Sequence, residues 1–178
     1  MTEQGGHRRV DRIRDPDYAT GLGDLPLEAL REKRDECMAE REYLSLLRRL
    51  VQGRAEILKA ELGARESGGE TAPLVDRLAT ILSADEHTRG SARGEALRVG
   101  VPEEELLLAR RRVERLVADA GLSDPTALDD DALGQAVEVM LSEERQVSEA
   151  RSEVMRVLDA LQEELKRRYK DDPTLALR

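Results

Sequence analysis

Apolar residues recur at every seventh position in two stretches of the chain. The first stretch has Leu30, Cys37, Leu44, Val51 and Leu58, and the second has Leu133, Met140, Val147, Val154 and Leu161. This spacing is typical of a helix that buries one stripe of side chains against a partner helix. The pattern predicts two long helices, at about residues 26–66 and 130–170, that pair antiparallel as a coiled coil.

Residues that favour helix ends agree with these ranges. Pro26 is tolerated in the first turn of a helix, and the segment Ser67-Gly68-Gly69 ends the first long helix. The second long helix starts next to three acidic residues, 129–131, which suit the positive end of the helix dipole. The segment Asp171-Asp172-Pro173 closes it.

Two shorter helices are predicted between the long ones. Residues 72–83 place leucine and isoleucine side chains on one face. Residues 102–120 begin with a proline and three glutamates, and their apolar face consists of Leu106, Ala109, Val113, Leu116 and Val117. The stretch between them, 84–101, is rich in glycine and charge and is interpreted as a mobile loop.

The predicted fold class is all-α: an antiparallel coiled coil of two long helices with short intervening helices. Residues 1–24 are polar and glycine-containing, so we interpret them as a disordered or mobile N-terminal tail, in which Val10 to Ile13 could form a short docking segment. Residues 25–172 form one helical domain, and 173–178 are a C-terminal tail.

The composition narrows the classes of protein to which the chain could belong. Hydrophobic residues make up 39% of the chain and charged residues 38%, with no Phe and no Trp, so Leu, Val and Ala must supply the buried area. A single cysteine, Cys37, fits a reducing compartment, and no segment resembles a membrane span or a signal peptide. The formal charge of −9 argues against non-specific nucleic-acid binding. We expect a cytoplasmic protein without direct DNA or membrane binding.

In each helix a second set of core positions lies four residues after the heptad residues, and this set is less apolar than the first. In the first helix these positions hold Arg34, Arg41, Arg48, Ala55 and Leu62, and in the last helix they hold Val137, Glu144, Arg151, Leu158 and Leu165. A dry coiled coil requires apolar side chains at such positions. The first helix departs from that requirement most strongly around Arg41 and Arg48.

Aligning the two helices by their apolar spacing shows that they repeat each other. The alignment pairs Ser45 with Ser148, Arg48 with Arg151, Glu56 with Asp159, Arg41 with Glu144, and Gln52 with Met155. On each helix these positions form a polar strip beside the apolar stripe. In an antiparallel pair the two polar strips are expected to face each other, with Arg48 close to Arg151 about a pseudo-twofold axis.

Two facing arginines repel each other unless an anion lies between them. Arginine together with a carboxylate is also the combination that recognises guanine, so a twofold ligand with guanines and phosphates would suit this cleft. The alternative is that Arg48 and Arg151 extend along the seam toward solvent and pair with neighbouring glutamates, as in many coiled coils.

These residues resemble the RsiG family of actinobacterial anti-sigma factors, whose pattern is E-x3-S-x2-R-x3-Q-x3-D on each of two antiparallel helices. The last helix matches at Glu144, Ser148, Arg151 and Asp159, with Met155 in place of Gln. The first helix matches at Ser45, Arg48 and Gln52, with Arg41 in place of Glu and Glu56 in place of Asp. The segments Leu47 to Arg54 and Asp15 to Tyr18 are also similar to the family.

The resemblance implies a regulatory role. Members of the family use cyclic di-GMP to hold a WhiG-type sigma factor of the flagellar class, with a nucleotide dimer between the two helices. It implies that Arg48, Arg151 and Asp159, and by extension Glu56, contact guanine and phosphate. Because three pattern positions differ, binding is expected to persist but to be weaker or asymmetric. On this interpretation the helical domain is an anti-sigma domain.

Other functions stay open at this point. No nucleophile–base arrangement, zinc spacing or phosphate-binding loop is present, so an enzyme is not expected. The main alternative is a nucleotide-independent coiled-coil adaptor or scaffold; a further one is a coiled-coil factor that acts on RNA polymerase. The first helix also has a second apolar face, which either the short helices or a protein partner could cover: Tyr43, Leu46, Leu47, Leu50 and Ile57.

Overall fold

The computed structural model describes residues 9–66, 103–119 and 127–177, and every regular element in these ranges is helical. The all-α fold class is therefore confirmed. The chain divides into two compact units. We call Met1–Leu46 with Gln146–Arg178 the terminal unit, and Leu47–Arg145 the middle unit.

The two long helices lie where the heptad pattern predicts them. Helix α2 spans Leu27–Glu66 and helix α5 spans Asp130–Asp171, and each contributes a segment to both units. The backbone N–H of Ala132 donates to the Asp129 carboxylate at 2.7 Å, which caps the start of α5. Arg168 and Lys170 in the last turn of α5 suit the negative end of the helix dipole.

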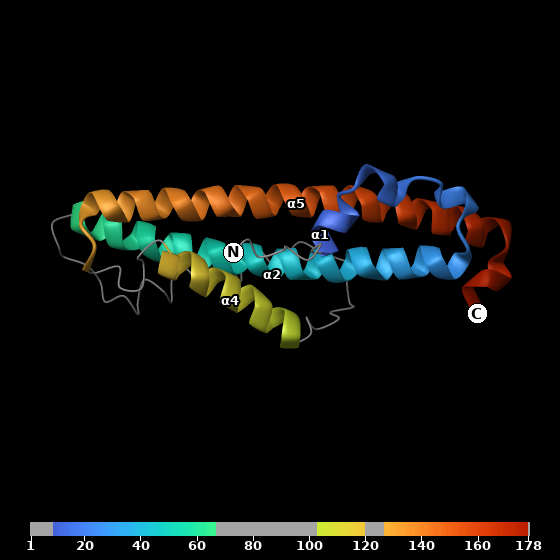
Figure 1. Cartoon of the computed structure of the whole chain (residues 1–178), viewed down its shortest axis with the longest axis horizontal. Helices are drawn as coiled ribbons and strands as arrows, with labels where there is room; N and C mark the ends of the chain where they lie inside the picture. Colours follow the sequence, from blue (N-terminus) through green and yellow to red (C-terminus); the bar gives the residue numbers. More distant parts are fainter. Residues whose placement is uncertain (1–8, 67–102, 120–126, 178) are drawn as a thin grey trace, which may run out of the picture. The chain divides into compact units, whose positions relative to one another are not determined.

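Within each unit the segments of α2 and α5 lie side by side and run antiparallel (Figure 1). In the terminal unit, Arg31 donates to the Tyr169 hydroxyl at 3.1 Å and Arg151 donates to the Ser45 hydroxyl at 2.9 Å. Early residues of α2 therefore contact late residues of α5, as expected for antiparallel helices. In the middle unit, the contacts of Arg48 with Glu144 and of Arg65 with Asp130 show the same direction.

The heptad residues form the cores of both units. All ten of them are at most 2% exposed: Leu30, Cys37, Leu44, Val51, Leu58, Leu133, Met140, Val147, Val154 and Leu161. Burial of one such side chain contributes roughly 1.5–3 kcal/mol. In the second set of core positions, Ala55, Val137, Leu158 and Leu165 are buried, whereas Leu62 is half-buried. The arginines and Glu144 in that set stay partly exposed.

Residues 9–24 do not form the mobile tail that the sequence predicts. They fold into α1 (Arg9–Ile13) and two 3-10 turns, η1 (Pro16–Ala19) and η2 (Leu22–Asp24), in the terminal unit. Ile13 is fully buried and Tyr18 is 7% exposed, so these two side chains anchor a segment that is mostly polar. The expected docking segment at Val10 to Ile13 coincides with α1, and Gly21 supplies the left-handed turn before η2 with φ 61°.

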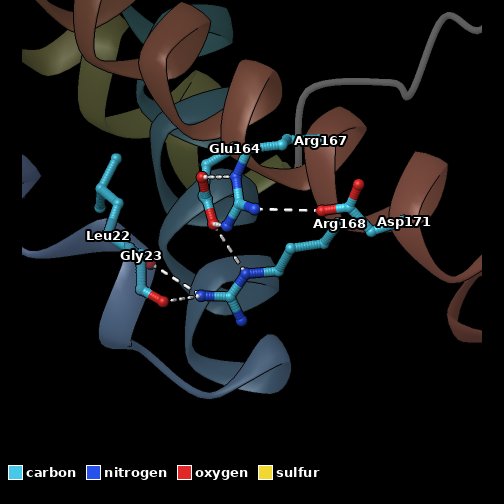
Figure 2. Close-up of polar contacts among 6 residues, drawn as sticks. All are labelled: Leu22, Gly23, Glu164, Arg167, Arg168 and Asp171. Carbon is cyan, nitrogen blue, oxygen red and sulfur yellow. Dashed lines mark hydrogen bonds and ion pairs between the residues drawn. The ribbon is translucent and has the colours of Figure 1, made fainter.

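Arg168 of α5 ties this segment to the end of the long helix. Its guanidinium donates to the carbonyls of Leu22 and Gly23, both at 2.9 Å, and to Glu164 at 2.8 Å (Figure 2). Arg167 donates to the same carboxylate at 2.7 Å. The hydrogen bonds from Arg167 and Arg168 lower the pKa of Glu164 from 4.5 to about 2.

In the middle unit, helix α4 (Glu103–Asp119) corresponds to the predicted helix at 102–120. Ala109 and Val117 of its predicted apolar face are buried, and Arg112 pairs with Glu143 of α5 at 2.6 Å. The predicted helix at 72–83 and the loop at 84–101 lie outside the described residues. The predicted C-terminal tail contains a 3-10 turn, η5 (Pro173–Leu177).

We predict that Glu164→Gln lowers the thermal unfolding midpoint of the protein at neutral pH. A carboxyl whose pKa is depressed on folding stabilises the fold above its ordinary pKa of 4.5, and this stability is lost as pH falls toward about 2. The difference between wild type and variant should therefore shrink between these pH values in circular dichroism melts. Glu163→Gln, which changes an exposed carboxylate paired with Lys166, is the control and should have a much smaller effect. Equal effects of both changes would contradict the prediction.

Candidate ligand-binding site

The ten residues of the polar strips divide between the two units. Six lie in the terminal unit: Arg41, Ser45, Ser148, Arg151, Met155 and Asp159. Four lie in the middle unit: Arg48, Gln52, Glu56 and Glu144. All ten lie on α2 or α5, whose helical spacing brings residues three and four apart onto one face. Arg48 and Arg151 belong to different units, and their expected proximity stays a prediction.

In the middle unit, Arg48 reaches across to the opposite helix. Its Nε donates to Oε1 of Glu144 at 2.7 Å, and Nε2 of Gln52 donates to the same oxygen at 3.2 Å. The Arg48 side chain is 40% exposed and that of Glu144 is 18% exposed, so the pair remains open to solvent on one side. Glu56 lies farther along α2, where it is exposed and pairs with Lys59 on its own helix at 3.0 Å.

In the terminal unit, Arg151, which is aligned with Arg48 in the repeat, donates to a different kind of acceptor. Nε of Arg151 donates to the Ser45 hydroxyl at 2.9 Å, and that hydroxyl donates to the Arg41 carbonyl at 2.7 Å. Met155 is half-buried and Asp159 is exposed. Ser45 thus links the guanidinium of one helix to the backbone of the other.

The difference between the two arginines follows from the charge reversal at Arg41. Glu144 accepts a hydrogen bond from Arg48, and in the alignment of the two helices the residue equivalent to Glu144 is Arg41. At the position where Arg48 meets a carboxylate, Arg151 is therefore matched with an arginine. The Arg41 side chain contacts Glu42 on its own helix at 2.6 Å. Among the described residues, Arg151 has a hydroxyl acceptor and no carboxylate within ion-pair distance. An anion is therefore better accommodated in the terminal unit than beside the neutralised Arg48.

Two further charged residues escaped the sequence analysis. Glu40 and Glu143 are buried, at 3% and 8% exposure, and the register that pairs Ser45 with Ser148 also pairs them with each other. Glu40 pairs with Arg9 of α1 and Glu143 with Arg112 of α4. The signal was present in the repeat, because both helices carry glutamate at the same register position. Their burial depends on elements outside the repeat.

Other kinds of chemistry find little support in the described ranges. No group of three or more His, Cys, Asp and Glu side chains there is placed to hold a metal ion. Burial raises the pKa of the Cys37 thiol to about 11, with a smaller opposite effect from the Tyr18 hydroxyl, so the thiol is protonated at neutral pH. Within the same ranges, no helix is long and apolar enough to cross a membrane.

A comparison with models of protein families finds a match to one part of the chain. Residues 16–82 match the model of the RsiG-like family, a family of anti-sigma factors. The resemblance noted in the sequence is confirmed over this range, which contains all of α2 and its polar strip. Helix α5, with the second polar strip, lies beyond the match. No curated protein matches the chain.

We predict that the pair of Arg48 and Glu144 contributes little to folding. A double-mutant cycle with Arg48→Ala and Glu144→Ala should give a coupling of about 0.2–1 kcal/mol, because the pair is partly solvated. Urea unfolding followed by circular dichroism measures it, and the surface pair of Glu56 and Lys59 serves as the reference. A coupling of about 3 kcal/mol or more would instead mark a structural ion pair.

Proposed function

We propose that the chain is a cytoplasmic anti-sigma factor that binds cyclic di-GMP along the polar strips of α2 and α5 and sequesters a WhiG-type sigma factor. The observation that carries the proposal is the duplicated arginine. Arg48 and Arg151 occupy equivalent register positions, and each donates to a side chain of the opposite helix. The family match over α2 supports the same function.

The chemistry of the strips suits a nucleotide made of guanine and phosphate. Arginine donates to O6 and N7 of guanine or to phosphate oxygens, and carboxylates accept from the guanine N–H groups. Asp159 and Glu56 are exposed and hence accessible to such a ligand. The remaining positions of the proposed site are Arg41, Ser45, Gln52, Glu144, Ser148 and Met155.

The two arginines should contribute unequally to binding. Arg48 must exchange the Glu144 carboxylate for the ligand, whereas Arg151 exchanges only the neutral Ser45 hydroxyl. Arg41 lies in the same unit and pairs with Glu42 on its own helix. Because Arg48 gives up an attraction between opposite charges and Arg151 gives up a hydrogen bond to an uncharged hydroxyl, the net gain from an anionic ligand is larger at Arg151.

The second apolar face of α2 supports a protein partner. Leu47 is buried, but Tyr43, Leu46, Leu50 and Ile57 are half-buried in the units that contain them. Sigma factors are helical, and an amphipathic helix can cover such side chains in a groove. Sequestration of sigma in this way would keep it from RNA polymerase.

Calorimetric titration with cyclic di-GMP, with and without the sigma factor, tests the proposal. We expect Arg151→Ala to weaken nucleotide binding about tenfold or more, and Arg48→Ala to weaken it less, since a charged hydrogen bond contributes about 1.5–3 kcal/mol. Arg156→Ala and Arg49→Ala, which alter exposed arginines on the same two helices, are the matched controls and should bind normally. Circular dichroism should show unchanged helicity in all four variants.

The outcome separates this proposal from its alternative. Absence of nucleotide binding under both conditions, or equal sigma binding with and without nucleotide, would contradict the switch. The contact between Arg48 and Glu144 favours the alternative, a nucleotide-independent coiled-coil adaptor or scaffold, because it satisfies one arginine without a ligand. An adaptor would bind its partner in a manner that depends on salt but not on guanine nucleotides.

A further inference from the structure

The N-terminal segment, residues 9–24, is attached to helix α2. Nε of Arg9 lies 2.6 Å from Oε2 of Glu40, which is only 3% exposed. The Tyr18 hydroxyl donates to Oε2 of Glu36 at 2.7 Å. Because a buried carboxylate is costly without a cation, the ion pair with Arg9 is a contact that α2 requires when Glu40 is covered.

The same segment is also attached to helix α5. Arg14, the residue after α1, forms an ion pair with Glu153. Toward the other end of the segment, the guanidinium of Arg168 donates to the carbonyls of Leu22 and Gly23, both at 2.9 Å (Figure 2). The segment therefore bridges α2 and α5 within the terminal unit, in addition to the direct contacts between the two helices.

The contacts of this segment and the polar strips lie on opposite sides of the helix pair. At about 100° per residue, Glu36 and Glu40 fall on one side of the heptad stripe of α2, whereas Ser45 falls on the other side. The stripe of α5 separates Glu153 from Arg151 in the same way. Equivalent sides of two antiparallel helices face the same way. The segment thus bridges the helices on one side, and the hydrogen bond from Arg151 to Ser45 joins them on the other.

The hydrogen bond between Arg151 and Ser45 depends on the spacing of the two helices. Nε of Arg151 and the Ser45 hydroxyl are 2.9 Å apart, and a hydrogen bond weakens steeply with distance and misalignment. The hydroxyl is held on α2 by its own donation to the Arg41 carbonyl at 2.7 Å, so it does not follow a shift of α5. A contact that fixes the helix spacing on one side therefore also fixes this geometry on the other.

We propose that residues 9–24 act as a clamp that holds α2 and α5 at a fixed spacing in the terminal unit and thereby positions Arg151 for its ligand. The positioning role rests on the nucleotide binding proposed above, whereas the clamp itself does not. Ile13, which is fully buried, and Tyr18, at 7% exposure, supply the apolar part of the attachment. The ion pair of Arg14 is partly exposed and contributes less.

Hydrogen exchange of the full-length protein, followed by mass spectrometry, tests the clamp without nucleotide. Ile13→Ala removes a fully buried contact, so it should speed exchange about tenfold or more in residues 27–46 of α2 and 146–171 of α5. Residues 47–66, in the middle unit, should keep the wild-type rate. Val117→Ala, which truncates a buried side chain of α4 in the middle unit, is the matched control and should leave exchange in the terminal unit unchanged.

Calorimetric titration with cyclic di-GMP tests the positioning role. Ile13→Ala should weaken binding about fivefold or more, and Val117→Ala should bind normally. Added to Arg151→Ala, the Ile13→Ala change should cause little further loss, but added to Arg48→Ala it should cause its full loss, because the clamp acts through Arg151. A general loss of stability would instead weaken binding equally in both backgrounds. By reciprocity, saturating nucleotide should slow exchange in the terminal unit of the wild type.

A milder variant guards against loss of the fold. Arg14→Ala changes a partly exposed side chain, so circular dichroism should show unchanged helicity. It should speed exchange in the same two segments as Ile13→Ala, by a smaller factor.

Two kinds of result would overturn the inference. Faster exchange confined to residues 9–24 in Ile13→Ala and Arg14→Ala would show that the segment packs on the helices without holding them together. Unchanged nucleotide affinity of Ile13→Ala, or equal losses in the two arginine backgrounds, would show that the clamp does not position Arg151. Absence of nucleotide binding by the wild type would contradict the proposed function instead, and the exchange pattern would decide the clamp independently.

Discussion

The burial of one residue in seven along α2 and α5 is the constraint on which the rest of the structure depends. Because the chain has neither Phe nor Trp, these Leu, Val, Met and Cys side chains supply most of the contact between the two helices in each unit. Their register then determines which way every other side chain on the helices faces. The positions of the polar strips and of the buried glutamates therefore depend on the position of the apolar stripe.

Charged residues beside this stripe have partners from two sources, the opposite long helix and an element outside the repeat. Arg48 uses the opposite helix through Glu144, and Arg151 uses the hydroxyl of Ser45. Glu40 uses an element outside the repeat, Arg9. Each of these contacts replaces the water that the charged group loses on folding. Each is also a contact in which a charged group is held by a side chain that lies at the edge of the apolar stripe.

The two copies of the repeat have diverged in charge more than in apolar pattern. All ten heptad residues are buried, whereas Arg41 and Glu144 carry opposite charges at equivalent positions. A change of apolar side chain would open a cavity in the core, but a change of charge at the half-exposed edge costs little. The edge is thus where the two copies of the repeat can differ in charge while the helix pairing is kept.

The sequence by itself determined the two long helices, their limits and the buried stripe, because heptad spacing and end residues act locally and need no knowledge of other elements. It also revealed the repeat and the candidate residues of the polar strips. Tertiary structure alone decided which acceptor each arginine meets. It also decided that residues 9–24 pack on α2 and α5 within the terminal unit. The reason is that Ile13, Tyr18 and Arg9 are too few and too scattered to form a periodic pattern. Their burial depends on a surface that exists only once α2 and α5 have paired.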